Sequence, residues 1–383
     1  MSRNPYKIIR TVTVPQSIVF FEEVIMRMDR DGYETIVVTS PGKELDTFRQ
    51  RYPLQKVLEV PMERHISLMK DVKSLWQMRK VMCKEKPYMI HSMTPKAGLI
   101  TMIAGWLTGV PIRVHTFTGL VWPTATGLKR KILMVTDWLT CSCATHIIPE
   151  GQGVLDDLKT HRVCRKPMRV LGYGNVKGVD MDYFNPVKFV GIQKEKDLFR
   201  FIFVGRIVGD KGINELVEAF VHLNREYPFT MLTLVGKYEA DLDPIKPKTL
   251  QLIEDSICID ACGPKYGDDL LLEYIKSDCF VMPSYREGFP NTVMEAGAMG
   301  LPSIVTDING SREIIINGEN GIIVPPKNTD ALYLAMKQMI VNVCERKKMA
   351  ANSRALIASR FEKRFVQNCL IDYYNEIFNK KDE

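Results

Sequence analysis

The chain has 383 residues, more than one hydrophobic core usually organises, so its length predicts two domains. Its apolar content of 45% and charged content of 25% are typical of globular chains, and its formal net charge of +7 favours anionic partners such as nucleotide phosphates or acidic lipids without indicating nucleic acid. No stretch approaches the ~20 apolar residues of a membrane span, and the first residues lack the apolar region of a signal peptide, so we expect a cytoplasmic protein.

The first half of the chain alternates between strand and helix patterns. Helical periodicity covers residues 16–30 and 68–85, and strand patterns fall at residues 7–14, 34–39, 57–60, 88–91, 112–116, 145–148 and 169–171. Such alternation predicts a parallel sheet covered by helices on both faces. The first strand leads into Val14-Pro15-Gln16-Ser17 and lacks the G-x-G-x-x-G turn of a dinucleotide site, which disfavours an NAD-dependent enzyme.

Residues 171–178 contain three glycines and mark a change of composition. We interpret this stretch as a hinge, which places one domain at residues 1–175 and a second at residues 176–361. The alternation then restarts, with helical patterns at residues 212–227 and 268–277 and strand patterns at residues 199–204, 230–235, 257–261, 279–283, 302–306 and 321–324. From Thr329 to the end of the chain the periodicity is helical.

Two glutamates flank the expected start of a helix in the second half. Residues 279–283 predict a buried strand, and the helix that follows begins near Asn291. The backbone N–H groups at such a helix start attract anions, and carboxylates such as Glu287 and Glu295 accept hydrogen bonds from sugar hydroxyls. The pattern therefore suits a ligand with both phosphate and sugar groups, with a solvated loop and helix face as the alternative.

A glycine-rich segment with two cations follows the strand at residues 199–204. Its Gly205-Arg206 and Lys211-Gly212 pairs permit tight turns and place two positive charges at the carboxyl end of that strand. If Arg206 and Lys211 face the helix start at residues 291–292, they form a metal-free clamp for a diphosphate. Solvated charges on a glycine-rich loop are the alternative.

Four segments of the second half together carry a resemblance to a known family. They are residues 205–212, which contain both glycine-cation pairs, residues 283–290 (PSYREGFP), residues 295–302 (EAGAMGLP) and residues 306–310 (TDING). The chain thereby resembles the retaining glycosyltransferases of family 4, and residues 61–67, 91–98 and 115–120 resemble the bacterial capsule and O-antigen members. The resemblance implies the α/β GT-B fold, two Rossmann-like domains with parallel sheets facing a central cleft, with a last helix at residues 362–383 that packs back on the first domain.

The resemblance also implies roles for individual residues. Arg206 and Lys211 would bind the donor diphosphate, Glu287 the hydroxyls of the donor sugar, and Glu295 the ribose. The implied donor site consists of Gly205, Arg206, Lys211, Glu287, Gly288, Phe289, Pro290, Asn291, Thr292 and Glu295. His115 would lie near the reacting carbon and complete a catalytic set with Glu287, Arg206 and Lys211. From its spacing alone, a core histidine at the end of a strand is an equal alternative for His115. We expect Arg64, Thr94 and Lys96 to meet the acceptor, although a loop lysine is also commonly just solvated.

The implied activity is transfer of a sugar, with retention, from a nucleotide-sugar donor. The resemblance favours a UDP-sugar as donor and an undecaprenyl-diphosphate-linked glycan as acceptor, in the assembly of capsule, O-antigen or exopolysaccharide. Two alternatives stay open from the residues alone. One is a sugar-nucleotide epimerase of the same fold, and the other is a non-catalytic nucleotide-binding subunit of a polysaccharide assembly complex.

No metal cofactor is expected, and a membrane contact is considered. The cysteines lack C-x-x-C spacing, the six histidines are dispersed, and Asp241-Leu-Asp243 is too short a pattern to indicate a metal site. Residues 127–138 join a basic start to apolar residues and Trp138, which fits a peripheral helix on the anionic surface of the inner membrane. A buried helix with a solvated basic end is the slightly preferred alternative.

Overall fold

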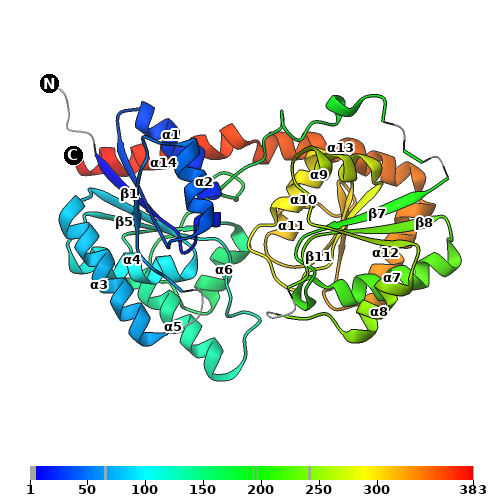
Figure 1. The fold of residues 1–383 in the computed structure, drawn as a ribbon, viewed down its shortest axis with the longest axis horizontal. Helices are drawn as coiled ribbons and strands as arrows, with labels where there is room; N and C mark the ends of the chain where they lie inside the picture. The colour runs from blue at the N-terminus through cyan, green and yellow to red at the C-terminus, as the bar shows by residue number, and fades with distance from the viewer. Residues whose placement is uncertain (1–5, 64–66, 193, 196, 240–242, 383) are drawn as a thin grey trace. The chain divides into compact units, whose positions relative to one another are not determined.

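The computed structural model describes residues 6–63, 67–192, 194–195, 197–239 and 243–382. The chain divides into two compact units (Figure 1). The first comprises Met1–Lys177 and Cys369–Glu383, and the second comprises Gly178–Asn368. Each unit contains a six-stranded sheet in which all described pairings are parallel, so the predicted α/β architecture with two parallel sheets is confirmed.

The first unit is a doubly wound sheet with the strand order β3-β2-β1-β4-β5-β6. Its strands are β1 (Lys7–Thr11), β2 (Glu34–Thr39), β3 (Lys56–Glu59), β4 (Met89–Met93), β5 (Ile112–Phe117) and β6 (His146–Pro149). Its helices are α1 (Glu22–Arg30), α2 (Lys43–Arg51), α3 (Leu68–Glu85), α4 (Pro95–Leu107), α5 (Gly127–Cys143) and α6 (Gln152–Thr160). Helices α3, α4 and α5 cover one face of the sheet, and α1 and α2 cover the other (Figure 1).

The second unit repeats this topology, with the strand order β12-β11-β10-β7-β8-β9. Its strands are β7 (Phe199–Val204), β8 (Thr230–Val235), β9 (Ile259–Gly263), β10 (Cys279–Met282), β11 (Ser303–Thr306) and β12 (Gly321–Val324). Its helices are α7 (Ile213–Glu226), α8 (Pro247–Asp255), α9 (Gly267–Lys276), α10 (Asn291–Ala298), α11 (Ser311–Ile314), α12 (Thr329–Val341) and α13 (Val343–Phe361). Strands β7 and β10 are buried throughout, as expected for central strands of a parallel sheet.

The last helix, α14 (Lys363–Asp382), belongs to both units. Its first residues, up to Asn368, are counted with the second unit, and those from Cys369 onward with the first. On the first unit, Tyr374, Ile377 and Phe378 pack into a hydrophobic cluster with residues of the sheet.

A fully buried arginine connects α14 to the sheet of the first unit. Arg10 on β1 donates from Nη1 to the Tyr374 hydroxyl at 2.6 Å, and its guanidinium lies 4.6 Å from the centre of the Phe21 ring. The same hydroxyl contacts Nδ1 of His91, whose Nε2 lies 2.7 Å from Oγ1 of Thr116. Burial lowers the pKa of Arg10 and the pKa of His91, and burial raises the pKa of Tyr374 to about 12. The hydroxyl is therefore a central hydrogen-bonding partner for two buried polar side chains.

Two predictions of local structure were wrong in the first unit. Residues 169–171 form no strand, because this segment is joined to β6 only by an isolated bridge between Met168 and Ile147 and by a hydrogen bond from the Arg169 N–H to the Ile147 carbonyl at 3.3 Å. The helix predicted at residues 16–30 is divided into a 3-10 helix, Pro15–Phe20, and α1. The break at Phe21 places that side chain in the core beside α2.

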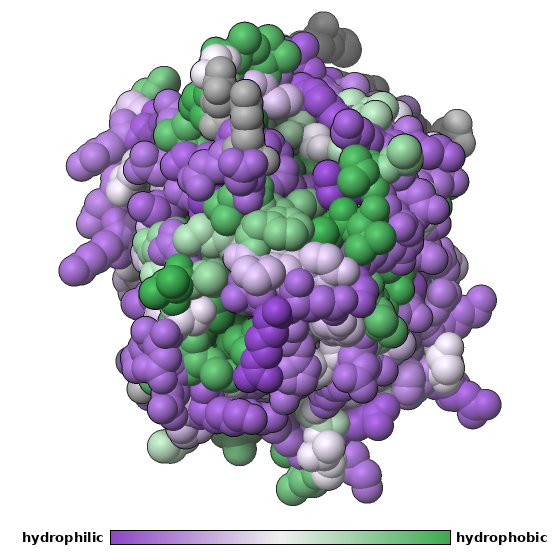
Figure 2. Space-filling view, turned by 90° about the vertical axis from the view of Figure 1, so that its right-hand side faces the viewer, coloured by the Kyte–Doolittle hydropathy of each residue, from purple (hydrophilic) through white to green (hydrophobic). Residues whose placement is uncertain are grey.

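The surface shows no single dominant hydrophobic area on the side that carries β8 and α7. Figure 2 shows that this side is largely hydrophilic, with hydrophobic residues in separated patches. Within the described ranges, none of the helices combines the length and apolar composition that crossing a bilayer requires.

Candidate active site

The second sheet changes its winding direction between β7 and β10. The chain proceeds from β7 to β8 and β9 on one side, whereas β10, β11 and β12 lie on the other. The loops that follow β7 and β10 therefore leave the carboxyl edge of the sheet at a topological switch point, where parallel α/β sheets bind ligands. These two loops contain the sequence segments 205–212 and 283–290.

Two glycines allow the loops to pack tightly around residues 283–290. Gly212 has φ +72°, and a Cβ atom there would lie 2.1 Å from the Pro283 carbonyl oxygen. Gly310 has φ +75°, and a Cβ atom there would lie 2.2 Å from the Gly288 carbonyl oxygen. The backbone N–H of Tyr285 also donates to the Asp210 carbonyl at 2.8 Å. The loop after β10 is thus held by backbone contacts on both sides, which fixes the position of Glu287.

The structure brings Lys211 and Glu287 together. Their side chains form an ion pair between Nζ and Oε1, and both side chains are only 14% exposed. Arg206 is more exposed and pairs with Glu239 at 3.0 Å. A cation that is partly removed from water interacts more strongly with a phosphate than a solvated one does. Of the two predicted clamp residues, Lys211 therefore offers the stronger electrostatic contribution.

Helix α10 begins directly after this loop. Pro290 occupies the N-cap position, and its side chain makes no hydrogen bond to the N–H groups of the first turn. The positive end of α10 therefore directly follows the loop that contains Glu287, the partner of Lys211. This arrangement suits an anion. Asn291 and Thr292 form the first turn, and Phe289 and Pro290 are buried before it.

Glu295 lies one turn into α10, where a tyrosine orients it. The Tyr274 hydroxyl is 3.4 Å from Oε2 of Glu295. Burial, with a smaller contribution from Glu295, raises the pKa of Tyr274 well above its ordinary value, so the tyrosine stays protonated and donates to the carboxylate. A carboxylate offers several acceptor sites, so Glu295 can also accept a hydrogen bond from a ligand hydroxyl.

Sequence reasoning missed several charged neighbours of the site. Arg286 pairs with Asp210 at 3.0 Å, and the Tyr285 hydroxyl donates to Glu215 at 2.6 Å. Lys327 lies with Nζ 4.7 Å from the centre of the Tyr285 ring. Arg286 and Tyr285 belong to residues 283–290, so the sequence motif already contained them. Asp210 precedes Lys211 in the glycine-rich segment, whereas no sequence pattern marked Glu215 or Lys327.

His115 is a core residue of the first unit. It lies on β5 with an exposed fraction of 1%, and its Nδ1 is 2.8 Å from the Ser92 hydroxyl. Burial lowers the pKa of His115 to about 3, so the imidazole is neutral at physiological pH. A Cβ atom at Gly98 would lie 2.3 Å from the ring, so α4 packs directly on it. Its place beside the reacting carbon stays a prediction.

Two of the predicted acceptor residues, Thr94 and Lys96, lie at the carboxyl edge of the first sheet, where β4 leads into α4. Thr94 has a left-handed backbone conformation with φ +70°, and its Oγ1 lies 2.7 Å from Oγ1 of Thr13. Lys96 is largely buried and pairs with Asp71 at 2.5 Å, so it is not the solvated loop lysine that was considered as an alternative. Arg64 and Asp241 lie outside the described residues.

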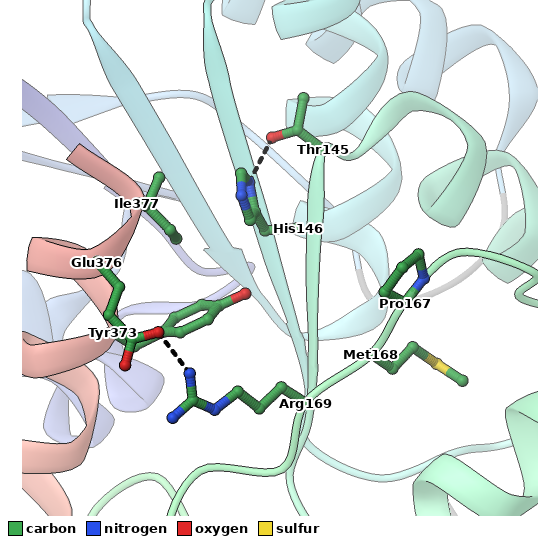
Figure 3. Close-up of a pocket in the computed structure, with 8 residues that line it drawn as sticks. All are labelled: Thr145, His146, Pro167, Met168, Arg169, Tyr373, Glu376 and Ile377. Carbon is green, nitrogen blue, oxygen red and sulfur yellow. Dashed lines mark hydrogen bonds and ion pairs between the residues drawn. The ribbon is translucent and has the colours of Figure 1, made fainter. Parts of the chain in front are cut away.

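A cavity in the first unit lies away from this edge. It has a volume of about 340 Å³ and is lined by the start of β6, residues 167–169 and helix α14 (Figure 3). Arg169 and Glu376 form an ion pair across its wall at 2.6 Å. Because the cavity adjoins the amino end of β6, it is not where ligands of parallel sheets are expected. In the part of the chain that the structure describes, no three His, Cys, Asp or Glu side chains gather as a metal site.

Comparison with known proteins identifies the class of this chain. Residues 186–356 match the family model described as glycosyl transferases group 1, and residues 18–174 match the glycosyl transferase 4-like domain. The chain is 30% identical over 382 residues to the capsular polysaccharide biosynthesis glycosyltransferase CapM of Staphylococcus aureus, with 98% of each chain covered. The protein therefore belongs to the group 1 glycosyltransferases.

Further relatives agree with this assignment. A UDP-Gal:alpha-D-GlcNAc-diphosphoundecaprenol alpha-1,3-galactosyltransferase of Escherichia coli is 30% identical over 327 residues, with 78% of each chain covered. Among solved structures, Anabaena HepE in complex with UDP and glucose has a TM-score of 0.79 at 17% identity, covering 97% of this chain and all of that one. A glycosyltransferase from Rickettsia africae has a TM-score of 0.77 at 18% identity over 98% and 99% of the two chains. These structures confirm the predicted GT-B fold.

Proposed function

We propose that this glycosyltransferase transfers a hexose from a UDP-sugar, with retention, to an undecaprenyl-diphosphate-linked glycan during assembly of a surface polysaccharide. The observation that carries the proposal is the largely buried Lys211–Glu287 pair beside the start of α10, at the switch point of the second sheet. It combines a cation and a helix terminus for a diphosphate with a carboxylate for sugar hydroxyls.

The identity of donor and acceptor draws on the relatives. The Escherichia coli relative uses UDP-galactose and a diphosphoundecaprenol-linked acceptor by its name, and the Staphylococcus aureus relative takes part in capsule synthesis. HepE is seen with UDP and with UDP-glucose. A lipid-linked acceptor requires the enzyme to work at a membrane surface, so the proposal includes peripheral contact with the bilayer.

The proposed chemistry is electrostatic. The bond between the anomeric carbon and the phosphate oxygen breaks, and Lys211, Arg206 and the start of α10 stabilise the charge on the leaving UDP. The acceptor hydroxyl attacks the same face of the sugar, and its proton passes to the departing phosphate oxygen. Glu287 holds the donor hydroxyls and Glu295 the ribose. The protein cations carry the charge stabilisation in this scheme, so we propose that no metal is needed.

A binding and turnover panel tests this proposal. The full-length protein is titrated with UDP, GDP, ADP and their sugar nucleotides, with and without a chelator, and active donors are then assayed with a diphosphate-linked lipid acceptor. We expect UDP-specific binding that the chelator does not alter, and a product with the anomeric configuration of the donor. Loss of binding with chelator would exclude the metal-free clamp. An isomeric sugar nucleotide formed without acceptor would identify an epimerase, and binding without any turnover a non-catalytic subunit.

A further inference from the structure

The distribution of tryptophans on the first unit is unusual. Trp76 is 57% exposed, Trp106 is 59% exposed and Trp138 is 50% exposed, whereas the fourth tryptophan of the chain, Trp122, is fully buried. The three exposed rings lie on three different helices, α3, α4 and α5. Large aromatic residues are normally buried, so three half-exposed ones on neighbouring helices call for a partner surface.

The three helices form one layer. Helix α4 packs against α3 on one side and α5 on the other, and all three cover the same face of the first sheet (Figure 1). Each helix carries apolar residues outward at helical spacing. The exposed ones are Leu68, Met69, Val72 and Trp76 on α3, Trp106 and Leu107 on α4, and Leu128, Ile132, Val135 and Trp138 on α5, and the partly exposed Leu99 and Ile103 on α4 lie at the same helical spacing. We call this set the three-helix face.

The charges on these helices have one sign. All three helices are described throughout, and their acidic residues, Asp71, Glu85 and Asp137, are buried or half-buried. The exposed charged residues are Lys70, Lys73, Arg79, Lys80 and Lys84 on α3 and Lys129 and Lys131 on α5. Lys70 pairs with Glu63 before α3, and Arg79 lies 5.5 Å from the Trp76 ring. Aliphatic residues, tryptophans and lysines on one surface match the boundary between lipid headgroups and acyl chains.

We propose that the three-helix face binds an anionic lipid bilayer. A second copy of the same face would bring the lysines of both copies together, and like charges at an interface are repulsive. An anionic surface instead attracts each exposed Lys or Arg, with roughly a fivefold gain in partitioning per residue near the surface. No helix crosses the membrane in this proposal, because the tryptophans and aliphatic side chains insert only to the depth of the headgroups.

The position of the face fits a lipid-linked acceptor, and this step depends on the proposed function. The helices begin where β3, β4 and β5 end, so their first turns lie at the carboxyl edge of the sheet. The Lys96–Asp71 ion pair joins the start of α4 to the first turn of α3 at this edge. A diphosphate headgroup held near Thr94 and Lys96 would therefore stand next to Leu68 and Met69, and its hydrocarbon chain would remain in the bilayer.

Tryptophan fluorescence and vesicle flotation of the full-length protein test the proposal. We expect binding to phosphatidylcholine vesicles that contain phosphatidylglycerol, at least about tenfold weaker binding to phosphatidylcholine alone, and loss of binding at high salt. Lipids brominated near the headgroup should quench the exposed tryptophans. A Trp76→Ser, Trp106→Ser, Trp138→Ser variant and a Lys73→Glu, Lys80→Glu variant should each bind at least about tenfold more weakly.

Matched controls distinguish membrane binding by the three-helix face from a defect in the donor site and from a subunit interface. A Leu334→Ser, Val341→Ser variant removes exposed apolar residues of α12 on the second unit and should bind vesicles like the parent protein. UDP binding by the tryptophan variant should be unchanged, so a failure of vesicle binding is distinguishable from a failure of the donor site. Equal binding to both vesicle types, or no quenching, would overturn the proposal. A change from dimer to monomer in the tryptophan variant, without any effect on vesicles, would identify the face as a subunit interface instead.

Discussion

At the scale of single residues, the Lys211–Glu287 pair is the feature from which catalysis is best predicted. Lys211→Ala removes a largely buried cation aimed at the proposed diphosphate, and Glu287 is left without its partner. We expect kcat/KM for the donor to fall by about 10²- to 10³-fold, mostly through kcat, because the charge it stabilises develops in the transition state. Steady-state kinetics with the donor identified in the panel measure this loss.

A second lysine provides the control. Lys337 on α12 pairs with Glu226 at 2.6 Å, on the same unit but at an exposed helix surface. Lys337→Ala should leave kcat/KM within about twofold of the parent value, since an exposed ion pair contributes little to stability or activity. If both substitutions cost the same activity, the diphosphate does not bind at Lys211.

Asp137 makes the stability of the first unit depend on pH. Its Oδ2 accepts a hydrogen bond from the Trp122 indole at 3.1 Å, and burial raises its pKa to about 7 from 3.8. Between these values the unfolded chain releases the proton and the folded chain keeps it, so the free energy of unfolding falls as pH rises through this window and levels off above it. The full loss is up to about 4 kcal/mol.

Asp137→Asn should remove that pH dependence. The asparagine side chain keeps an oxygen that accepts the hydrogen bond from Trp122, but it has no group that ionises. We therefore expect the free energy of unfolding of the variant to exceed that of the parent at pH 8 and to equal it near pH 4. Urea unfolding at both pH values measures the difference, and Asp156→Asn, on the exposed surface of α6, is the control. A constant difference across the pH range would mean that Asp137 is ionised in the folded protein.

At the scale of elements, the loop after β10 depends on glycines at its contact points. Gly212→Ala forces a Cβ atom against the Pro283 carbonyl in a left-handed conformation, so the loop must shift. Gly300 also has a positive φ, +81°, but nothing lies within 4 Å of a Cβ atom there. Gly300→Ala therefore measures the conformational strain alone, about 1 kcal/mol.

The two alanine variants should differ in activity as well as stability. Gly212→Ala should weaken UDP binding, because displacement of residues 283–290 moves Glu287, whereas Gly300→Ala should only lower the melting temperature. Calorimetric titration with UDP distinguishes them. Equal UDP affinity in both variants would show that the loop tolerates the displacement.

Elements with strong local patterns were predictable from the sequence. The strands at 34–39, 199–204, 230–235 and 321–324 and the helix at 68–85 were predicted with the bounds that the structure shows, because each is a continuous apolar run or a long periodic segment. The strand predicted at 169–171 was wrong because this segment meets β6 only at an isolated bridge, and a short apolar run does not show how far such pairing extends.

The sequence predicted only those parts of the candidate site whose residues are close together along the chain. Glu287 and Asn291 follow one strand, so their proximity could be inferred. The partners Glu239 of Arg206 and Asp210 of Arg286 come from other loops, and only coordinates pair them. The sequence also did not determine burial. A core position for His115 was one of two alternatives, and no pattern showed that Trp76 and Trp106 are exposed.

At the scale of the whole molecule, the two units have separate hydrophobic cores, and helix α14 is the element that they share. Separate cores predict two thermal transitions. UDP at about 100 times its Kd should stabilise the second unit by about 2.7 kcal/mol and raise only its transition. Differential scanning calorimetry with and without UDP tests this assignment.

Tyr374→Phe should act on the other transition. It removes the hydroxyl that accepts from buried Arg10 and contacts His91, which leaves two buried polar groups without that partner and costs about 1–3 kcal/mol. We expect the transition of the first unit to fall by about 2–4 °C for each kcal/mol, while the transition that UDP raises stays in place. Tyr373→Phe, one position earlier in α14, is the control, because its ring packs against His146 and Arg169 through contacts that phenylalanine retains. If Tyr374→Phe lowers both transitions together, α14 couples the two units into one cooperative unit, and UDP should then raise both.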